Sequence, residues 1–415
     1  MREMKDSGIE WIGDIPKNWI VMPIKYYFSV GRGRVISVND LHDDGKYPVY
    51  SSQTENNGCF GYLRTYDFSG PAITWTTDGA KAGTVFFRDG KYNCTNVCGI
   101  LKIKNQYKQT SDLHFLTYAI SVVAFANKRY DINGFKIMNN EMANIRYAIP
   151  PYEEQQKIAT FLDKKCTEID ALTKDIEKQI ENLQQYKKSV ITESVTKGLD
   201  PNVEMKSTDN KWFSKIPTSW SLKPIKYLFD IVSGSTPLST ESSFWDGDVK
   251  WVTPADFKTE DMYVSEGKRN ITTAGYRSCS TSILPKDSII FTKRAPIGTV
   301  AISSEELCTN QGCLGLIPKN SEVDTKFFYF VFSVFQEFFE LYGSGTTFKE
   351  ISASVFSNLR FVCPSIKEQK SIAEHLDDVC LRINSVIKSK QQQLTTLADY
   401  KKSLIFEYVT GKKEV

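Results

Sequence analysis

The chain has 415 residues, of which 41% are hydrophobic and 24% charged, a composition typical of a folded protein with more than one domain. Its 52 basic and 49 acidic residues leave a formal charge of +3, which excludes a polybasic protein that holds nucleic acid by charge alone. The longest apolar stretches, residues 118–126 and 327–335, reach about half of the ~20 residues that a membrane span needs. We therefore expect a soluble cytoplasmic protein with no membrane partner.

The chain opens with a motif that it later repeats. Eight residues between Trp11 and Tyr26 recur between Trp212 and Tyr227, each 201 positions further along. Later matches, such as Thr77 with Thr292, are offset by 213 to 215 positions. The pattern indicates an internal duplication with about 13 extra residues early in the second copy.

Each copy begins with a segment of mixed α/β character. Short strand-like runs at residues 71–75 and 83–87 are separated by turn residues, and a helix-like stretch follows at residues 111–128. The second copy has strand-like runs at residues 288–291 and 298–302 and one helix-like stretch at residues 325–342. Residues 1–150 carry 18 basic and 14 acidic side chains, whereas residues 201–364 carry 17 and 18, so only the first globule is visibly basic.

Each copy ends with a segment that predicts one long helix. Residues 152–197 and 365–410 contain no Gly or Pro, and apolar residues recur in them at alternating steps of three and four, as in a coiled-coil seam. The seam residues expected in the first helix are Leu162, Ile169, Leu172, Ile176, Leu183, Tyr186 and Val190. Those expected in the second helix are Leu376, Val379, Ile383, Val386, Leu397, Tyr400 and Leu404.

The predicted fold class is mixed α+β: two α/β domains, each followed by a long helix, related by an internal pseudo-two-fold repeat. The expected boundaries are a first domain at residues 1–150, a first helix at 151–200, a linker at 201–210, a second domain at 211–364 and a second helix at 365–415.

Residues that carry common catalytic chemistry are sparse. The three histidines, His42, His114 and His375, are too scattered for a metal site or a Ser-His-Asp triad. No phosphate-binding loop occurs, and Ile149-Pro150-Pro151-Tyr152 lacks the amide or carboxylate with which an amino-methyltransferase motif begins. The nine cysteines form no CxxC pair, which favours reduced, mostly buried thiols. We expect a non-catalytic chain with no metal or cofactor of its own.

The duplicated organisation indicates recognition. DNA-binding dimers mirror the symmetry of their sites, so two related but unlike globules in one chain would read an asymmetric, two-part sequence. A helix of about 44 residues is roughly 66 Å long, which limits the span to about 19 base pairs.

Recurring segments carry a family resemblance. The long helices begin with Pro150-Pro151-Tyr-Glu-Glu154-Gln155 and Pro364-Ser-Ile-Lys-Glu368-Gln369, and further pieces are Trp11 to Trp19, Trp212 to Trp220, Ser233-Gly-Ser-Thr-Pro237, Lys250-Trp-Val-Thr-Pro254, Thr309-Asn-Gln311 and Gly345-Thr-Thr-Phe-Lys-Glu350. In this order, and over essentially its whole length, the chain resembles the specificity (S) subunits of type I restriction-modification systems.

The resemblance implies a role and a set of partners. Each globule would be a target recognition domain that reads one half of a bipartite site in double-stranded DNA. The two helices would pack antiparallel as a spacer and would dock two methyltransferase subunits, which restriction motor-nuclease subunits would join in host defence. S-adenosylmethionine, ATP and magnesium would belong to those partners.

Candidate residues follow from this reading. Base edges are read by Arg, Lys, Asn, Gln, Ser and Thr, and phosphates by basic and small polar groups. The DNA-binding candidates are Arg32, Arg34, Ser52, Gln53, Thr77, Lys81, Lys128, Arg129 and Lys136 in the first globule and Ser235, Thr236, Lys250, Thr253, Lys293, Arg294, Asn310, Gln311, Thr347 and Lys349 in the second. The candidates on the partner-docking helices are Leu162, Ile169, Leu172, Ile176, Leu183, Leu376, Ile383, Val386, Leu397 and Leu404.

Discrimination between DNA sequences is expected where the copies differ, as at Asp78-Gly79 against Lys293-Arg294. The alternative hypothesis is a non-catalytic scaffold, in which duplicated globules bind protein or glycan and the coiled coil serves as a tether.

Overall fold

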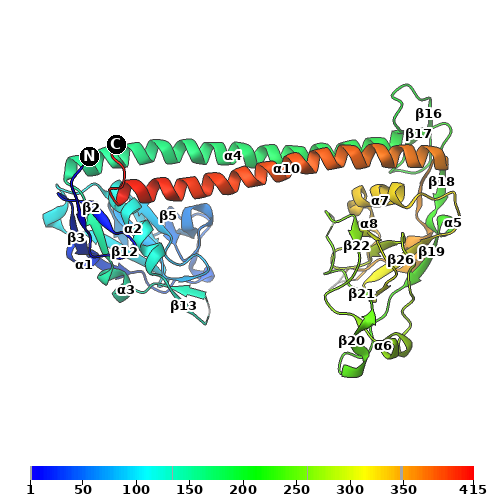
Figure 1. Ribbon diagram of the computed structural model, residues 1–415, viewed down its shortest axis with the longest axis horizontal. Helices are drawn as coiled ribbons and strands as arrows, with labels where there is room; N and C mark the ends of the chain where they lie inside the picture. Colours follow the sequence, from blue (N-terminus) through cyan, green and yellow to red (C-terminus); the bar gives the residue numbers. More distant parts are fainter. Residues whose placement is uncertain (1, 133, 259, 346–348) are drawn as a thin grey trace. The chain divides into compact units, whose positions relative to one another are not determined.

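The computed structural model describes residues 2–132, 134–258, 260–345 and 349–415. The chain divides into two compact units (Figure 1). Unit 1 comprises residues 1–177 and 391–415, and unit 2 comprises residues 178–390. Each unit therefore contains one globule together with a segment of each long helix. The fold class predicted from the sequence is confirmed.

The globule of unit 1 is built around a four-stranded antiparallel sheet with the order β10-β8-β12-β4. The central strand β8 is buried along its whole length. On one face Ile73 and Trp75 pack with Phe115 of helix α2, and on the other Ala72 packs with Tyr92. The elements are β4 (Phe28–Arg32), β8 (Ala72–Thr76), β10 (Val85–Arg88), β12 (Cys98–Ile103) and α2 (Leu113–Asn127).

Smaller sheets surround this core. Strand β5 pairs in parallel with β11 in the sheet β6-β5-β11-β7, and the hairpin β13–β14 extends to β9. The bounds are β1 (Met4–Asp6), β2 (Asp14–Pro16), β3 (Ile20–Pro23), α1 (Ile24–Tyr27), β5 (Tyr47–Tyr50), β6 (Cys59–Leu63), β7 (Phe68–Ser69), β9 (Asp78–Gly79), β11 (Lys91–Cys94), β13 (Arg129–Asp131), β14 (Gly134–Lys136), α3 (Asn139–Asn144) and β15 (Arg146–Ile149). Short 3-10 turns span Val38–Asp40, Glu55–Gly58 and Asn105–Tyr107.

The globule of unit 2 has a five-stranded sheet with the order β19-β26-β23-β24-β22, and β21 pairs in parallel with β25 as β5 does with β11. The bounds are β16 (Met205–Ser207), β17 (Lys215–Pro217), β18 (Ser221–Pro224), α5 (Ile225–Leu228), β19 (Phe229–Ser233), η4 (Ser242–Phe244), β20 (Trp245–Val249), β21 (Trp251–Val252), β22 (Tyr263–Val264), α6 (Thr273–Ser278), β23 (Ile289–Thr292), β24 (Val300–Ser303), β25 (Cys308–Thr309), β26 (Cys313–Pro318), α9 (Ala353–Asn358) and β27 (Arg360–Cys363).

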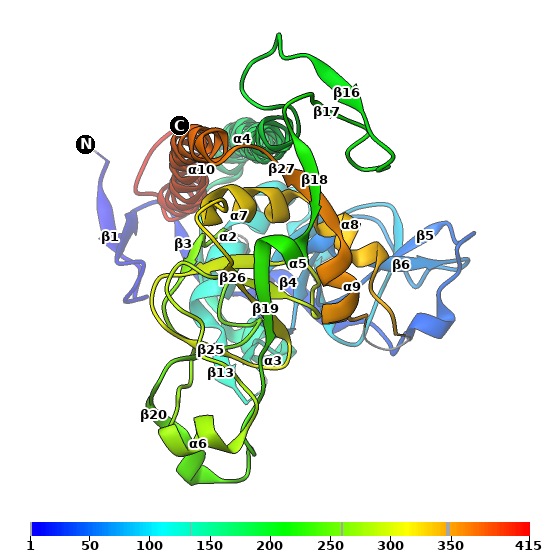
Figure 2. The same cartoon turned by 90° about the vertical axis from the view of Figure 1, so that its right-hand side faces the viewer.

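One expectation for this part of the chain is corrected. The stretch at residues 325–342 is not one helix but two, α7 (Thr325–Val334) and α8 (Gln336–Leu341), because the backbone of Phe335 leaves the helical region at φ −105° and ψ 26°. The rings of Phe335, Phe338 and Phe339 all pack against Phe361, so tertiary packing sets the break. Part of the expected linker forms strand β16, which pairs with β17 in a hairpin (Figure 2).

The structure also shifts one match between the copies by a residue. The hydroxyl of Thr76 accepts a hydrogen bond from the Thr84 amide at 3.0 Å, and that of Thr292 accepts one from the Thr299 amide at 2.9 Å. Thr292 is therefore the counterpart of Thr76 and not of Thr77.

The two long helices, α4 (Tyr152–Lys197) and α10 (Ile366–Val409), end where the absence of Gly and Pro predicted. A buried glutamine fixes the start of each. In unit 1 the side chain of Gln155 accepts from the Asp112 amide at 2.9 Å and donates to the Pro150 carbonyl at 2.9 Å. Gln369 makes the same two bonds to Asp324 and Pro364 in unit 2, at 2.8 and 3.0 Å. Asp112 and Asp324 are the N-caps of α2 and α7, so the recurring glutamine joins the long helix to its globule.

Within each unit the α4 and α10 segments run antiparallel (Figure 1). In unit 1, Phe161 packs on Tyr408 with ring centroids 4.5 Å apart, and Lys401 Nζ lies 2.6 Å from an Asp170 carboxylate oxygen. In unit 2, Lys187 donates to the Asn384 amide oxygen at 2.9 Å, and Lys390 contacts Gln179. The contacts therefore pair later residues of α4 with earlier residues of α10, as in an antiparallel pair of helices.

The seam differs in part from the expected one. The buried and half-buried positions that alternate by three and four are Cys166, Ile169, Thr173, Ile176, Ile180, Leu183 and Lys187 in α4, and Cys380, Ile383, Ile387, Lys390, Leu394, Leu397 and Lys401 in α10. Leu172, Tyr186, Val386 and Tyr400 were expected in the seam but are 45–58% exposed. Each lies one position before a seam residue. Polar or lysine side chains occupy several of the true seam positions, so the pattern of apolar residues alone did not give the correct heptad register.

The nine cysteines are all free thiols, and seven of them are buried, as expected. Burial raises the pKa of Cys308 to about 11 and that of Cys313 to about 12, because a thiolate is poorly solvated there. These two thiols are therefore protonated and weakly nucleophilic at neutral pH.

Candidate nucleic-acid interface

In unit 1, several of the predicted contact residues meet around the loop that joins β11 to β12. The Arg34 amide donates to the Cys94 carbonyl at 3.2 Å. The Thr77 hydroxyl donates to the Val97 carbonyl at 2.9 Å, and the Ser52 hydroxyl donates to the same oxygen. Three segments far apart in the sequence therefore converge on one loop.

The convergence assigns some of these side chains to the scaffold. Thr77 is only 3% exposed, and its amide donates to Ser52 Oγ at 3.2 Å. The Gln53 side chain donates to the Cys59 carbonyl. Groups whose hydrogen-bonding capacity is already used inside the protein are poorly placed to read bases. We therefore assign Ser52, Gln53 and Thr77 a role in anchoring the loops.

The basic candidates of unit 1 fall into three groups. Arg32 and Lys81 are exposed, and their side chains make no ion pair within the described part of the chain. Arg34 pairs with Asp67 at 2.9 Å. The others lie on and beside the hairpin β13–β14: Lys128 Nζ lies 4.1 Å from the ring centroid of Phe125, and Arg129 and Lys136 are cross-strand partners.

One carboxylate compensates the like charges on this hairpin. Asp131 lies 2.9 Å from Lys136 and 3.2 Å from Arg129, and Arg129 also pairs with Glu141 at 2.6 Å. The hydrogen bond from Lys136, followed by the Ile132 amide and then Arg129, lowers the pKa of Asp131 to about 2. The hairpin therefore carries a fixed anion between two cations.

The same hairpin exposes apolar side chains that sequence reasoning missed. Phe125 is 64% exposed, Tyr130 77% and Ile132 94%. Single exposed apolar residues are ordinary, and these three lie beside the basic side chains of the hairpin, where Lys128 covers the ring of Phe125. The alternation of apolar and basic residues over residues 125–136 was the available signal.

In unit 2 the predicted residues meet around the equivalent loop, residues 309–312. The Ser235 amide donates to the Thr309 carbonyl at 3.0 Å, the Asn310 amide to the Val252 carbonyl at 3.0 Å, and the Lys293 amide to the Gly312 carbonyl at 2.9 Å. The two globules therefore assemble the same structural site from corresponding segments.

Here too some of the side chains are structural. The Asn310 amide oxygen accepts from Gly312 at 2.9 Å, and Thr253 is bound to Asp256 through its amide and its hydroxyl at 2.8 and 2.7 Å. Thr236 contacts Gln311, and Lys250 pairs with Glu305. We assign Asn310 and Thr253 to loop closure.

The remaining basic candidates of unit 2 lie beside one acid. Lys293 and Arg294 approach Glu350 at 2.9 and 3.6 Å. Gln311 and Lys349 are exposed. Thr347, the remaining candidate, lies outside the described residues. The Ile137 amide donates to the Thr77 carbonyl and the Ile351 amide to the Lys293 carbonyl, so Lys293 and Arg294 are the counterparts of Thr77 and Asp78. The copies therefore do differ here, but one residue earlier than the expected match of Asp78-Gly79 with Lys293-Arg294.

The residues predicted to dock partners on the helices are of two kinds, buried seam residues and exposed surface residues. Leu162, Ile169, Leu376, Ile383 and Leu404 are at most 7% exposed and Ile176, Leu183 and Leu397 are half-buried, so these residues hold the fold. Leu172 and Val386, which are 52% and 45% exposed, are accessible to a partner. The two are counterparts in the repeat, 214 positions apart.

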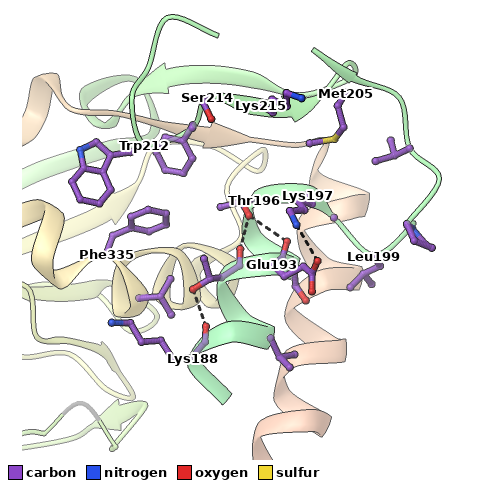
Figure 3. Close-up of a pocket in the computed structure, with 18 of the residues that line it drawn as sticks. Lys188, Glu193, Thr196, Lys197, Leu199, Met205, Trp212, Ser214, Lys215 and Phe335 are labelled. Carbon is purple, nitrogen blue, oxygen red and sulfur yellow. Dashed lines mark hydrogen bonds and ion pairs between the residues drawn. The ribbon is translucent and has the colours of Figure 1, made fainter. Parts of the chain in front are cut away.

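An open groove of about 1070 Å³ lies in unit 2 at the end of α4, beside the β16–β17 hairpin and α8 (Figure 3). Trp212, Phe335 and Met205 line it together with an ion pair between Lys197 and Glu193 at 3.1 Å. None of the predicted site residues lies in this groove.

The described residues contain no cluster of three His, Cys, Asp or Glu side chains arranged to hold a metal ion. They also contain no helix with the length and apolar character to cross a membrane.

The chain is similar to known proteins over most of its length. The family model for the type I restriction modification DNA specificity domain matches residues 16–182 and 217–396. The chain is 37% identical over 193 residues to the type I restriction enzyme MjaIX specificity subunit of Methanocaldococcus jannaschii, a match that covers 46% of this chain but only 43% of that relative. It is 24% identical over 428 residues to the putative MjaX specificity subunit of the same organism, covering 97% and 96% of the two chains.

Two solved structures share the fold. A chain from a structure of a type I R-M system superposes with a TM-score of 0.73 at 14% identity, covering 96% of this chain and 99% of that one. The HsdS subunit of Thermoanaerobacter tengcongensis gives a TM-score of 0.51 at 13% identity, covering 96% and 98%. At these identities the likeness shows the arrangement of the elements.

Proposed function

The chain belongs to the type I restriction modification DNA specificity family, and from that membership we propose that it is the DNA-recognition subunit of a type I restriction-modification complex. Each globule reads one half of an asymmetric bipartite site in double-stranded DNA. The observation that best supports this proposal is the duplicated site. Equivalent loops at residues 94–97 and 308–312 are hydrogen-bonded to corresponding segments of the two globules, but the side chains around them differ.

The long helices supply the spacer in this proposal. Helices of 46 and 44 residues, about 69 and 66 Å at 1.5 Å per residue, suit a device that sets the gap between half-sites. Two methyltransferase subunits dock on the helices, where Leu172 and Val386 are exposed at equivalent places. The repeat itself supports two equivalent partners, because two like surfaces bind two like molecules.

The chemistry belongs to the partners. The chain acts without catalysis of its own, S-adenosylmethionine serves the methyltransferase subunits, and ATP and magnesium serve restriction motor-nuclease subunits. The complex works in the cytoplasm, where the DNA is. The family match favours this function over the alternative of a protein- or glycan-binding scaffold.

The proposal is tested by co-expressing the chain with its methyltransferase in a host without other DNA methylation and mapping the methylated bases. We expect one asymmetric, two-part sequence to be modified, and purified complex to lose affinity for that sequence as salt rises. Methylation without any shared sequence, or a complex that does not retain DNA at low salt, would overturn it.

A further inference from the structure

The loop between β5 and β6 in unit 1 lies against the loop at residues 94–97. The Thr95 amide donates to the Tyr50 carbonyl at 2.9 Å, and the Thr95 hydroxyl donates to the Ser51 hydroxyl at 2.9 Å. Ser52 and Gln53 fix the base of the loop through the bonds described above, and the Ser51 amide closes it on the Gly58 carbonyl at 3.1 Å. The base of the loop is thus attached to the centre of the candidate interface.

The tip of this loop holds a rare backbone conformation. Asn56 (φ 48°, ψ 40°) and Asn57 (φ 54°, ψ 34°) both adopt the left-handed region, and Gly58 follows at φ 75°. Non-glycine residues adopt it at a cost in free energy, and asparagine tolerates it best. Two in succession persist only because the surrounding structure determines them, which is typical of functional loops.

The loop rests on a buried cation. Arg88 is 3% exposed, and its guanidinium lies 3.6 Å from the ring centroid of Tyr50 and 4.4 Å from that of Phe86. A Cβ at Gly58 would lie 3.0 Å from Arg88 Nη2 and 3.2 Å from the Gln53 carbonyl oxygen. A glycine therefore suits this position because of its positive φ and its close approach to Arg88 and Gln53.

The side-chain amides at the tip of the loop are available for hydrogen bonds with another molecule. Asn56 and Asn57 are exposed, and neither side chain makes a hydrogen bond to any residue that the structure describes. The neighbouring charge at the tip is the exposed Glu55, which disfavours contact with phosphates. A carboxamide offers one donor face and one acceptor, the pattern that pairs with N7 and N6 of adenine in the major groove.

The corresponding loop of unit 2 is built differently. It follows β21 as this loop follows β5, but Thr253 and Asp256 close it, and no left-handed asparagine occurs there. Two half-sites of different sequence need a difference of this kind between otherwise equivalent loops.

We propose that Asn56 and Asn57 read an adenine-containing base pair in the half-site bound by the first globule, with the left-handed loop over Arg88 holding the two amides in place. This inference rests on the proposed function, because it names the side chains that discriminate within one of the two half-sites.

The test uses the complete complex, co-expressed with its methyltransferase, and maps the methylated sites of N56G, N57G and the double variant. Glycine keeps the left-handed backbone and removes only the amide, so the melting temperature should stay the same or rise. We expect the complex to relax its base preference at one position of one half-site, by roughly 10-fold to 100-fold, with the other half-site unchanged. N56D and N57D keep the size and backbone tolerance but lose the donor, so they should also lose the preference for adenine.

Asp287→Gly is the matched control, since Asp287 is an exposed left-handed residue (φ 65°) in unit 2 that carries no amide. It should leave both half-sites unchanged. An unaltered set of methylated sites for the N56G/N57G double variant would overturn the inference. A wild-type complex without sequence-specific methylation would instead refute the proposed function, so the two failures are distinguishable.

Discussion

Lys401 places its ammonium 2.6 Å from the carboxylate of Asp170, and the repeat makes the same contact again between Lys187 and Asn384 at 2.9 Å. In each helix the two contact residues are 17 positions apart: Asp170 and Lys187 in α4, and Asn384 and Lys401 in α10. Both contacts form together only while these separations match. The two contacts therefore specify the register between the helices, as polar seam residues often do.

The matched separations predict how the spacer responds to length. Insertion of seven residues between Lys178 and Gln179 alone should break one of the two lysine contacts and lower the melting temperature. Insertion there and also after Lys390 should restore the register and lengthen the recognised gap by about 3 base pairs, since seven residues rise about 10.5 Å. Methylated-site mapping and thermal unfolding check both variants. A chain with both insertions that still recognises the original gap would contradict the spacer role proposed for the helices.

Gln155 is predicted to stabilise the junction between globule and helix. Its side chain is 1% exposed, and Gln155→Ala would leave the Asp112 amide without a partner, at a cost of about 1–3 kcal/mol. Thermal or denaturant unfolding should show the loss, and hydrogen exchange should accelerate at the start of α2. Gln156→Ala, at an exposed neighbouring position, is the control and should change little. Equal effects of the two variants would remove the role assigned to Gln155.

The free cations of unit 1 are predicted to contact phosphates. Arg32→Gln and Lys81→Gln should each weaken DNA binding by the assembled complex and reduce the slope of log affinity against log salt by about 1. Stability should be unchanged, because neither side chain makes an ion pair with a described residue. Lys174→Gln, at an exposed position of α4, is the matched control and should leave the slope as it is.

Asp131 gives the hairpin β13–β14 a defined dependence on acid. Its pKa is about 2 in the folded chain against an ordinary 3.8, so the unfolded state takes up a proton first as the pH falls. The stabilising effect is complete above about pH 4 and is lost as the pH falls through about 2. A carboxyl NMR titration should show this midpoint. Lys136→Met should raise it more than Arg129→Met does, and a midpoint near 3.8 in the unaltered chain would contradict the ion-pair geometry.

The sequence predicted the large-scale organisation because its signals were local or repeated. Residues 152–197 lack Gly and Pro, and helix α4 spans them all. The strand-like runs at 71–75 and 298–302 became β8 and β24 with small shifts at their ends. The convergence of Arg34 and Thr77 on one loop in unit 1, and of Ser235 and Lys293 on its counterpart in unit 2, was also within reach, since the repeat relates Arg34 to Ser235 and Thr77 to Lys293.

What it did not predict depends on contacts between distant residues. The break at Phe335 follows from packing on Phe361, and β16 exists because β17 pairs with it. Thr77 looked like a contact residue until Val97 and Ser52 were seen to use its polar atoms. Asn56 and Asn57 formed a turn signal in the sequence, but their left-handed backbone and free amides depend on the whole loop.

The division of the chain has a consequence for its synthesis. Unit 2 is one continuous stretch, whereas unit 1 needs residues 391–415, which emerge only after all of unit 2. Roughly 240 residues separate Glu177 from the end of the chain, about 12 to 48 s of translation at about 5–20 residues per second. During that interval the nascent first globule lacks Leu404 and Val409, which complete its core. The globule that leaves the ribosome first is thus the last to be finished, and it is the one that a chaperone would need to shield.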